Sequence, residues 1–152
     1  MSRGIHPSVV STHGLSPALK ALRRRSHVPV KLDLRVDRRL PEQVEVAAYY
    51  IVSEALTNAA KHADATRVWV SVRIDEDRLC LSIRDDGVGG ADPTRGSGLI
   101  GLKDRVEAIG GKISIESPPQ EGTRIEVELP LDPTQVAEAP TSAAPAPRAA
   151  RA

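Results

Sequence analysis

The chain has 152 residues and a formal net charge of +1, which excludes a strong whole-protein field for recruiting nucleic acid or a membrane surface. It has no Phe, one Trp and two Tyr, so its core must be built from Val, Ile, Leu and Ala. The single cysteine, Cys80, allows no internal disulfide and is typical of a reducing compartment. No apolar run approaches the roughly 20 residues of a membrane span, and no signal peptide is visible. We therefore expect a soluble cytoplasmic protein with no membrane segment and no direct contact with nucleic acid.

Residues 1–29 are interrupted by proline and glycine and are expected to form an N-terminal linker segment. Within this segment, Ser16 as N-cap and Pro17 at the first helical position predict a short helix of about residues 17–25. The basic run at 23–25 is either a solvated helix end or a contact for phosphate or a partner.

Residues 30–36 alternate between apolar and polar side chains, which predicts a half-buried strand. Pro41 then begins a helix that reaches about His62, with Glu42 and Glu45 near its positively charged end. Apolar residues recur along this helix at helical spacing, so one broad face is expected to be buried.

Two further alternating runs, 66–74 and 78–84, flank a tight polar turn and predict an antiparallel hairpin. The chain then continues with a glycine-rich loop at 85–98 and a helix at 99–109, which Gly110-Gly111 ends. Two strands joined by a turn follow, at 112–116 and 123–129. This order predicts an α/β sandwich with one mixed, largely antiparallel sheet and helices on one face. We place the folded domain at 30–131 and expect the Ala- and Pro-rich tail, 132–152, to be disordered.

Four polar residues of the long helix, Glu54, Asn58, Lys61 and His62, are three or four positions apart and share one face. The amide oxygen of Asn58 is a suitable ligand for Mg²⁺, and Glu54 could polarise water or a hydroxyl group. Lys61 and His62 could meet phosphate charge. An amphipathic helix with a polar edge is the alternative interpretation.

The strand at 78–84 runs into DDGVGG, whose first carboxylate is Asp85. This carboxylate could accept a hydrogen bond from an exocyclic amine such as that of adenine, and Gly87 and Gly89 would allow backbone to approach a flat ring. A plain acidic glycine turn is the alternative. Further along, GSGLIG begins a helix whose free N–H groups could bind phosphate. The three clusters in this order indicate a nucleotide site.

With these motifs the chain resembles the ATP-binding catalytic domain of bacterial two-component sensor histidine kinases, which has the Bergerat fold of the GHKL ATPase superfamily. IVSEALTNAAKH is similar to the N box, DDGVGG to the DxGxG box, GSGLIGLKDRV to the second glycine-rich box, and Gly122-Thr123 to the later GT element. The short segment at 90–98 is most similar to the subfamily that pairs with helix-turn-helix response regulators. The resemblance covers about residues 3–131.

The resemblance implies ATP and Mg²⁺ as cofactors. Asp85 would bind the adenine amine, Thr123 would support it from the last strand, and Gly87 and Gly89 would line the base pocket. Asn58 would hold Mg²⁺, with Glu54 at the position of the water-activating base of the superfamily's ATPases. The remaining implied residues face the phosphates or shape the lid hinge and phosphate cradle: Lys61, His62, Gly98, Leu99, Gly101 and Leu102.

The implied activity is that of a histidine protein kinase, which transfers the ATP γ-phosphoryl group to a histidine on a dimerisation domain, in cis or in trans, and so serves a response regulator indirectly. Family members carry this histidine on a long helix, whereas His6, His13 and His27 lie in sequence broken by Pro and Gly. We therefore expect the phosphoacceptor outside this chain, which is either an excised domain or a stand-alone partner. The alternative is an ATP-binding anti-sigma-type regulatory module or a serine kinase of the same superfamily.

Overall fold

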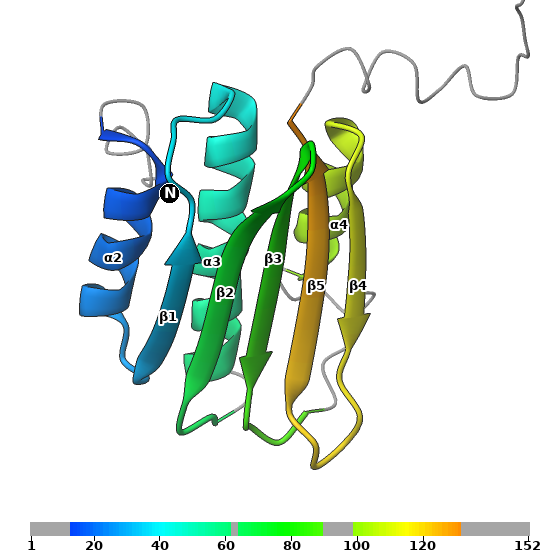
Figure 1. The fold of residues 1–152 in the computed structure, drawn as a ribbon. Coiled ribbons are helices and arrows are strands. Elements are labelled where there is room, and N and C mark those ends of the chain that lie inside the picture. The colour runs from blue at the N-terminus through cyan, green and yellow to red at the C-terminus, as the bar shows by residue number, and fades with distance from the viewer. Residues whose placement is uncertain (1–12, 62–63, 90–98, 132–152) are drawn as a thin grey trace, which may run out of the picture.

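The computed structural model describes residues 13–61, 64–89 and 99–131. It contains the helices α2 (Leu15–Arg25), α3 (Glu42–Lys61) and α4 (Leu99–Ala108), and the strands β1 (Val30–Arg35), β2 (Val68–Asp75), β3 (Arg78–Asp85), β4 (Lys112–Glu116) and β5 (Thr123–Pro130). The strands form one sheet in the order β1-β2-β3-β5-β4, and the helices lie against one face of it (Figure 1). Strand β1 pairs with β2 in parallel, and the other neighbours are antiparallel. The predicted α/β sandwich with a mixed, largely antiparallel sheet is confirmed.

The core lies between the sheet and the helices and is aliphatic, as the composition requires. Alternate residues of the central strands point into it, so that Val70, Ile83 and Ile125 are buried side by side in register across β2, β3 and β5. Full burial of one such side chain stabilises the fold by about 1.5–3 kcal/mol. Most strands and helices end within two residues of their predicted bounds, which is the ordinary uncertainty of element ends.

Helix α3 is the central helix behind the sheet (Figure 1). Its apolar stripe is buried as predicted, with Ile51 and Val52 at 0% and 1% exposure. Small residues, such as Ala48 and Ala59, are also fully buried on this helix. Because these residues place little bulk between helix and sheet, α3 can pack closely, and the polar residues at its carboxyl-terminal end lie near the edge of the core.

Helix α2 begins earlier than predicted. Ser16 lies inside the helix and is not its N-cap, which is Gly14 with φ 95° and no side-chain capping bond. The reason is that Leu15 and Leu19 are apolar at helical spacing and both are buried in the common core, which outweighs a capping preference. The boundary predicted between residues 29 and 30 would cut this helix from the core that buries it, and we propose that the folded unit includes α2. The predicted tail lies outside the described residues.

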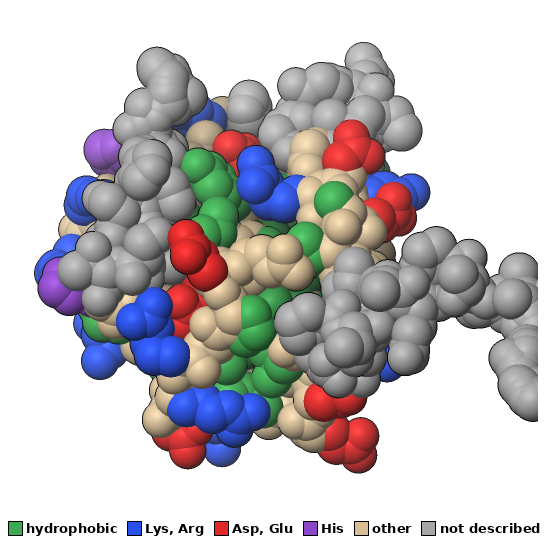
Figure 2. Space-filling view, turned by 90° about the horizontal axis from the view of Figure 1, so that it is seen from above, with side chains coloured by type: hydrophobic (Ala, Val, Ile, Leu, Met, Phe, Trp, Pro, Cys, Tyr) green, Lys and Arg blue, Asp and Glu red, His purple; other side chains and the backbone are tan. Residues whose placement is uncertain are grey.

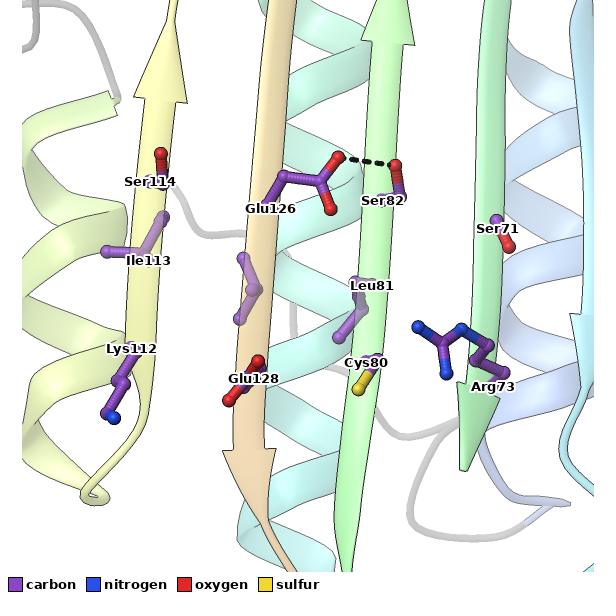
Figure 3. Close-up of a pocket in the computed structure, with 11 residues that line it drawn as sticks. Ser71, Arg73, Cys80, Leu81, Ser82, Lys112, Ile113, Ser114, Glu126 and Glu128 are labelled. Carbon is purple, nitrogen blue, oxygen red and sulfur yellow. Dashed lines mark hydrogen bonds between the residues drawn. The ribbon is translucent and has the colours of Figure 1, made fainter. Parts of the chain in front are cut away.

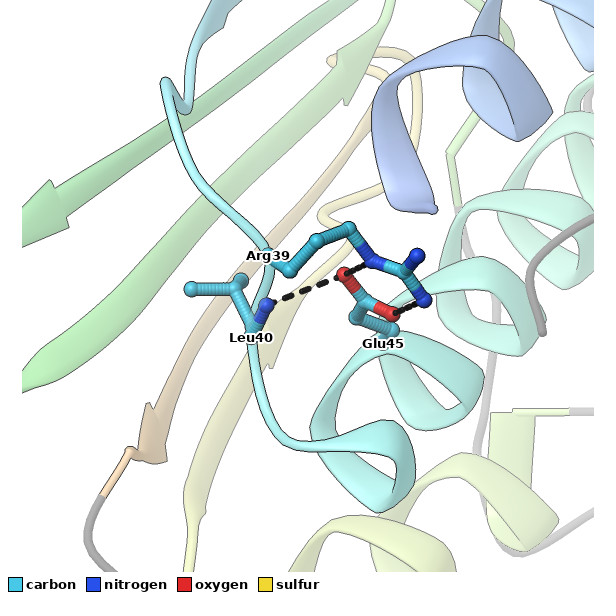
Figure 4. Close-up of polar contacts among 3 residues, drawn as sticks. All are labelled: Arg39, Leu40 and Glu45. Carbon is cyan, nitrogen blue, oxygen red and sulfur yellow. Dashed lines mark hydrogen bonds and ion pairs between the residues drawn. The ribbon is translucent and has the colours of Figure 1, made fainter. Parts of the chain in front are cut away.

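Glu45 is only 1% exposed, although its position indicated a surface charge at the start of α3. Its carboxylate accepts hydrogen bonds from the backbone N–H of Leu40 at 3.1 Å and from Nε and Nη2 of Arg39 at 3.2 and 3.1 Å (Figure 4). The bidentate pair compensates the buried charge, while half of the Arg39 side chain remains in solvent. This contact fixes the connection from β1 into α3.

Charged side chains of both signs intermingle with hydrophobic ones over the end of the molecule seen from above in Figure 2. This distribution agrees with the small net charge and gives this end no field of a single sign. Within the described ranges, no helix is both long and apolar enough to cross a membrane.

Candidate functional site

Asp85 is the last residue of β3 and is 5% exposed. Its Oδ1 accepts a hydrogen bond from the backbone N–H of Gly87 at 2.9 Å, and Thr123 lies opposite it on β5. Burial raises the pKa of Asp85, and backbone hydrogen bonds from Gly87 and Thr123 act against this rise. The result is a fixed, buried carboxylate at the end of the sheet, with acceptor capacity beyond the backbone bonds from Gly87 and Thr123.

Thr123 is also buried, and its hydroxyl oxygen lies 2.7 Å from Oγ of Ser117. Ser117 follows β4, and the turn that separates it from β5 brings it back beside Thr123. Ser117 therefore positions the Thr123 hydroxyl, a role that the sequence analysis did not assign. No periodicity or motif pointed to Ser117, because its contact depends on the path of the turn.

The glycines at this end are required by close backbone packing. Gly89 has φ 69°, and a Cβ there would lie 2.0 Å from the carbonyl oxygen of Pro118. Gly122 has φ 78°, and its Cβ would lie 2.1 Å from the carbonyl oxygen of Asp85. Both positions combine a left-handed backbone with a contact that no side chain tolerates. The DxGxG turn and the turn before β5 thus pack directly on each other.

Asp86, the second carboxylate of the DxGxG turn, is exposed but well bonded. It accepts hydrogen bonds from the N–H of Thr66 at 2.8 Å, from the Thr66 hydroxyl, and from the N–H of Arg67 at 3.0 Å. These bonds, the Thr66 hydroxyl first, lower the pKa of Asp86 below its usual value. Asp86 therefore joins the chain segment that follows α3 to the end of β3, which the sequence analysis missed.

The predicted polar residues of α3 pass from buried to exposed along the helix. Asn58 is 5% exposed, Glu54 is half-buried, and Lys61 is exposed in the last turn. Oδ1 of Asn58 has no hydrogen-bond partner among the described residues. An unsatisfied buried acceptor costs about 1–3 kcal/mol, so this oxygen is available to a water molecule or a ligand. The carboxyl-terminal ends of α3 and β3 lie at the same end of the sheet as the start of β5 (Figure 1).

The remaining predicted residues lie around α4 or outside the described ranges. His62 and Gly98 are outside them, and the side chain of Leu99, at the start of α4, is also not described. Gly101 is exposed on α4, and a Cβ there would meet nothing within 4 Å. Leu102 is 2% exposed and belongs to the core, so only its backbone is available for a phosphate contact.

Comparison with known proteins agrees with these motifs. Residues 43–133 match the family described as histidine kinase-, DNA gyrase B-, and HSP90-like ATPase. The sensor histidine kinase YdfH of Bacillus subtilis is 40% identical over 107 residues, which cover 66% of this chain and 26% of that protein. The histidine-protein kinase/phosphatase DegS of Brevibacillus brevis is 34% identical over 126 residues, which cover 78% of this chain and 33% of that protein. The chain therefore spans about a quarter to a third of these relatives.

Solved structures show the same fold. The histidine kinase domain of a blue-light activated kinase from Erythrobacter litoralis aligns with a TM-score of 0.57 at 24% identity, covering 82% of this chain and 61% of that one. The histidine kinase AdeS of Acinetobacter baumannii aligns with a TM-score of 0.55 at 17% identity, and the alignment covers 83% of this chain and 64% of that one.

Proposed function

Because this chain belongs to the family of histidine kinase-, DNA gyrase B- and HSP90-like ATPases, as its motifs predicted, we propose that it is the ATP-binding kinase domain of a two-component signalling protein. The γ-phosphoryl group passes from ATP to a nitrogen of a histidine on a dimerisation domain, in cis or in trans; the bond from γ-phosphorus to the bridging oxygen breaks, and ADP leaves. A response regulator then receives the phosphoryl group. The observation that carries this proposal is the fixed, buried carboxylate of Asp85 beside Thr123.

Asp85 would select adenine. Its carboxylate can accept a hydrogen bond from the 6-amino group of adenine, whereas guanine carries a carbonyl oxygen at that position and would be repelled. The Thr123 hydroxyl, held by Ser117, is placed to support the same edge of the base, directly or through water. Gly87 and Gly89 would line this pocket.

Asn58 fits the role of a Mg²⁺ ligand because its buried amide oxygen accepts no hydrogen bond from any residue that the structure describes. Mg²⁺ binds oxygen ligands and combines few protein groups with phosphate oxygens and water, where it would neutralise phosphate charge. Glu54 lies one helical turn away and would orient water or the attacking group. Lys61 and His62 would face the phosphates, and Gly98, Leu99, Gly101 and Leu102 would form the hinge and phosphate cradle.

Replacing Asn58 with Ala should remove most of the Mg²⁺-dependent part of ATP affinity and leave adenosine binding unchanged. The unliganded fold should lose little stability, because the substitution also removes an unsatisfied buried acceptor. Calorimetric titrations with ATP and adenosine, with and without Mg²⁺, measure the first effect, and urea unfolding measures the second. Equal losses for ATP and adenosine would mean that Asn58 supports the fold and not the metal.

The proposed activity is tested with γ-labelled ATP, with the chain alone and with a histidine-bearing dimerisation domain supplied in trans. We expect label on the supplied domain and none on the chain itself, because in-line transfer requires an acceptor nitrogen held close to the γ-phosphorus. The label should be acid-labile, as phosphohistidine is, and absent when the acceptor histidine is replaced by Ala. Acid-stable label on a partner serine would instead favour the serine kinase, and acid-labile label on this chain alone would place the acceptor within it.

A further inference from the structure

The sheet face opposite the helices carries a row of three basic residues and one tryptophan across four strands. Lys31, Trp69, Arg84 and Arg124 are neighbours in register on β1, β2, β3 and β5. We call these four residues the basic row. It ends at Glu116, which pairs with Arg124 from β4. Because adjacent strands are about 4.8 Å apart, the row is about 14 Å long.

Three arginines elsewhere on this face form ion pairs: Arg35 with Asp33 at 3.3 Å, Arg73 with Asp75 at 3.3 Å, and Arg78 with Glu128 at 2.8 Å. In the part of the chain that the structure describes, no carboxylate forms an ion pair with Lys31, Arg84 or Arg124. Three exposed cations are therefore available to an external anion.

Trp69, the single tryptophan of the chain, lies in the middle of this charge. The guanidinium carbon of Arg84 is 4.1 Å from the centre of its ring, and that of Arg67 is 5.9 Å from it. These cation–π contacts hold the ring on the open face, where it is only partly buried. Trp and Arg are the residue types that contribute most to binding energy at protein interfaces.

The surface beside the basic row is hollow. A depression of about 430 Å³ is lined by the row and by the residues beside it: Asp33, Val70, Ser71, Ser82 and Glu126. It continues into a second depression of about 240 Å³, which shares Ser71, Ser82 and Glu126 with the first. Figure 3 shows this second depression, in which Ser82 donates a hydrogen bond to Glu126. The short serine side chains create this hollow, so a partner group can lie against the edge of Trp69.

We propose that the basic row binds an acidic helical segment of a partner protein or domain. Carboxylates one turn apart on a helix are about 5–6 Å from each other, which matches Arg84 and Arg124 on the neighbouring strands β3 and β5. An apolar residue of the same helix would fill the hollow beside Trp69.

The row is too narrow for a polyanion. Asp33 and Glu126 lie two residues further along their strands, and Glu116 closes one end. Duplex nucleic acid carries a negative charge about every 1.7 Å and would meet these carboxylates, as would an anionic membrane surface. A helix with a single line of carboxylates avoids them.

The test uses the intact chain and two synthetic helical peptides, one with glutamates one turn apart beside a leucine, the other with glutamines in their place. The glutamate peptide should change Trp69 fluorescence and bind more weakly as salt is raised. Arg84→Gln with Arg124→Gln should weaken it about tenfold or more. Arg35→Gln, a charge loss on the same face at a paired residue, should have little effect, and all variants should keep ATP affinity.

Three results would overturn this inference: no binding of the glutamate peptide, equal binding of the glutamine peptide, or tighter binding of duplex DNA or anionic vesicles than of the glutamate peptide. ATP affinity does not depend on any of these three binding results, because the basic row lies on the sheet face away from the helices. The proposed kinase function can therefore fail while the docking surface holds, and the reverse also applies.

Discussion

Replacing Asp85 with Asn should weaken the binding of both ATP and ADP by about ten- to a hundredfold, as expected for the loss of a charge-assisted hydrogen bond. The Asp85 carboxylate accepts backbone hydrogen bonds from Gly87, at 2.9 Å, and from Thr123. Its two oxygens retain further acceptor capacity for the amine of adenine. Asn has one acceptor oxygen and an NH2 donor in place of the other, so it cannot keep both backbone bonds and also accept a hydrogen bond from the base.

The loss of affinity should not come from unfolding. Burial raises the pKa of Asp85, which means that the folded state disfavours the ionised form and that a neutral side chain relieves this cost. The Asn variant should therefore unfold at the same urea concentration as the wild type, or at a higher one. Asp75→Asn, an exposed residue of an ion pair, makes the same charge change elsewhere and should leave both affinities intact. Wild-type affinity for ATP and ADP in the Asp85 variant would exclude Asp85 from the base pocket.

The elements of this fold could be predicted because each has a local signature. Alternation identified the inward residues of β2 and β3, and helical spacing identified the buried stripe of α3. The neighbours in the sheet had no such signature: β5 lies between β3 and β4, although β4 precedes it in the chain. Alternation determines which face of a strand is buried, but the choice of partner strand depends on packing between distant segments.

In the candidate site, too, features with a local sequence signature could be predicted, and contacts between distant segments could not. Motifs singled out Asp85 and Asn58 because the residue types themselves carry the chemistry, and the structure buries both polar side chains. The supporting contacts of Ser117 and Asp86 could not be predicted, since each joins segments brought together only by the fold. Glu45 shows the limit of local rules: a charge at a helix start is expected to be exposed, and hydrogen bonds from Arg39 and from the backbone of Leu40 compensate its burial.

The largest loss of stability is expected for Gly122→Ala, about 3 kcal/mol or more. The new methyl group would lie 2.1 Å from the carbonyl oxygen of Asp85, in a left-handed conformation that Ala disfavours. Asp85 is held in register with Thr123 across β3 and β5, so the carbonyl cannot move away without disturbing the sheet. Urea unfolding should show the loss, and ATP binding should fall with it because the same movement displaces the Asp85 carboxylate.

Gly101→Ala is the matched control for this prediction. Gly101 is exposed on α4 and a Cβ there meets nothing within 4 Å, so the change should stabilise the fold by about 0.5–1 kcal/mol through helix propensity. If Gly101 belongs to the phosphate cradle, its variant will bind ATP more weakly while unfolding at a higher urea concentration. We therefore expect the two variants to shift in opposite directions in the same unfolding experiment. This difference distinguishes a glycine required by backbone packing from one required by a ligand. Equal destabilisation by both substitutions would contradict the close contact between Gly122 and Asp85.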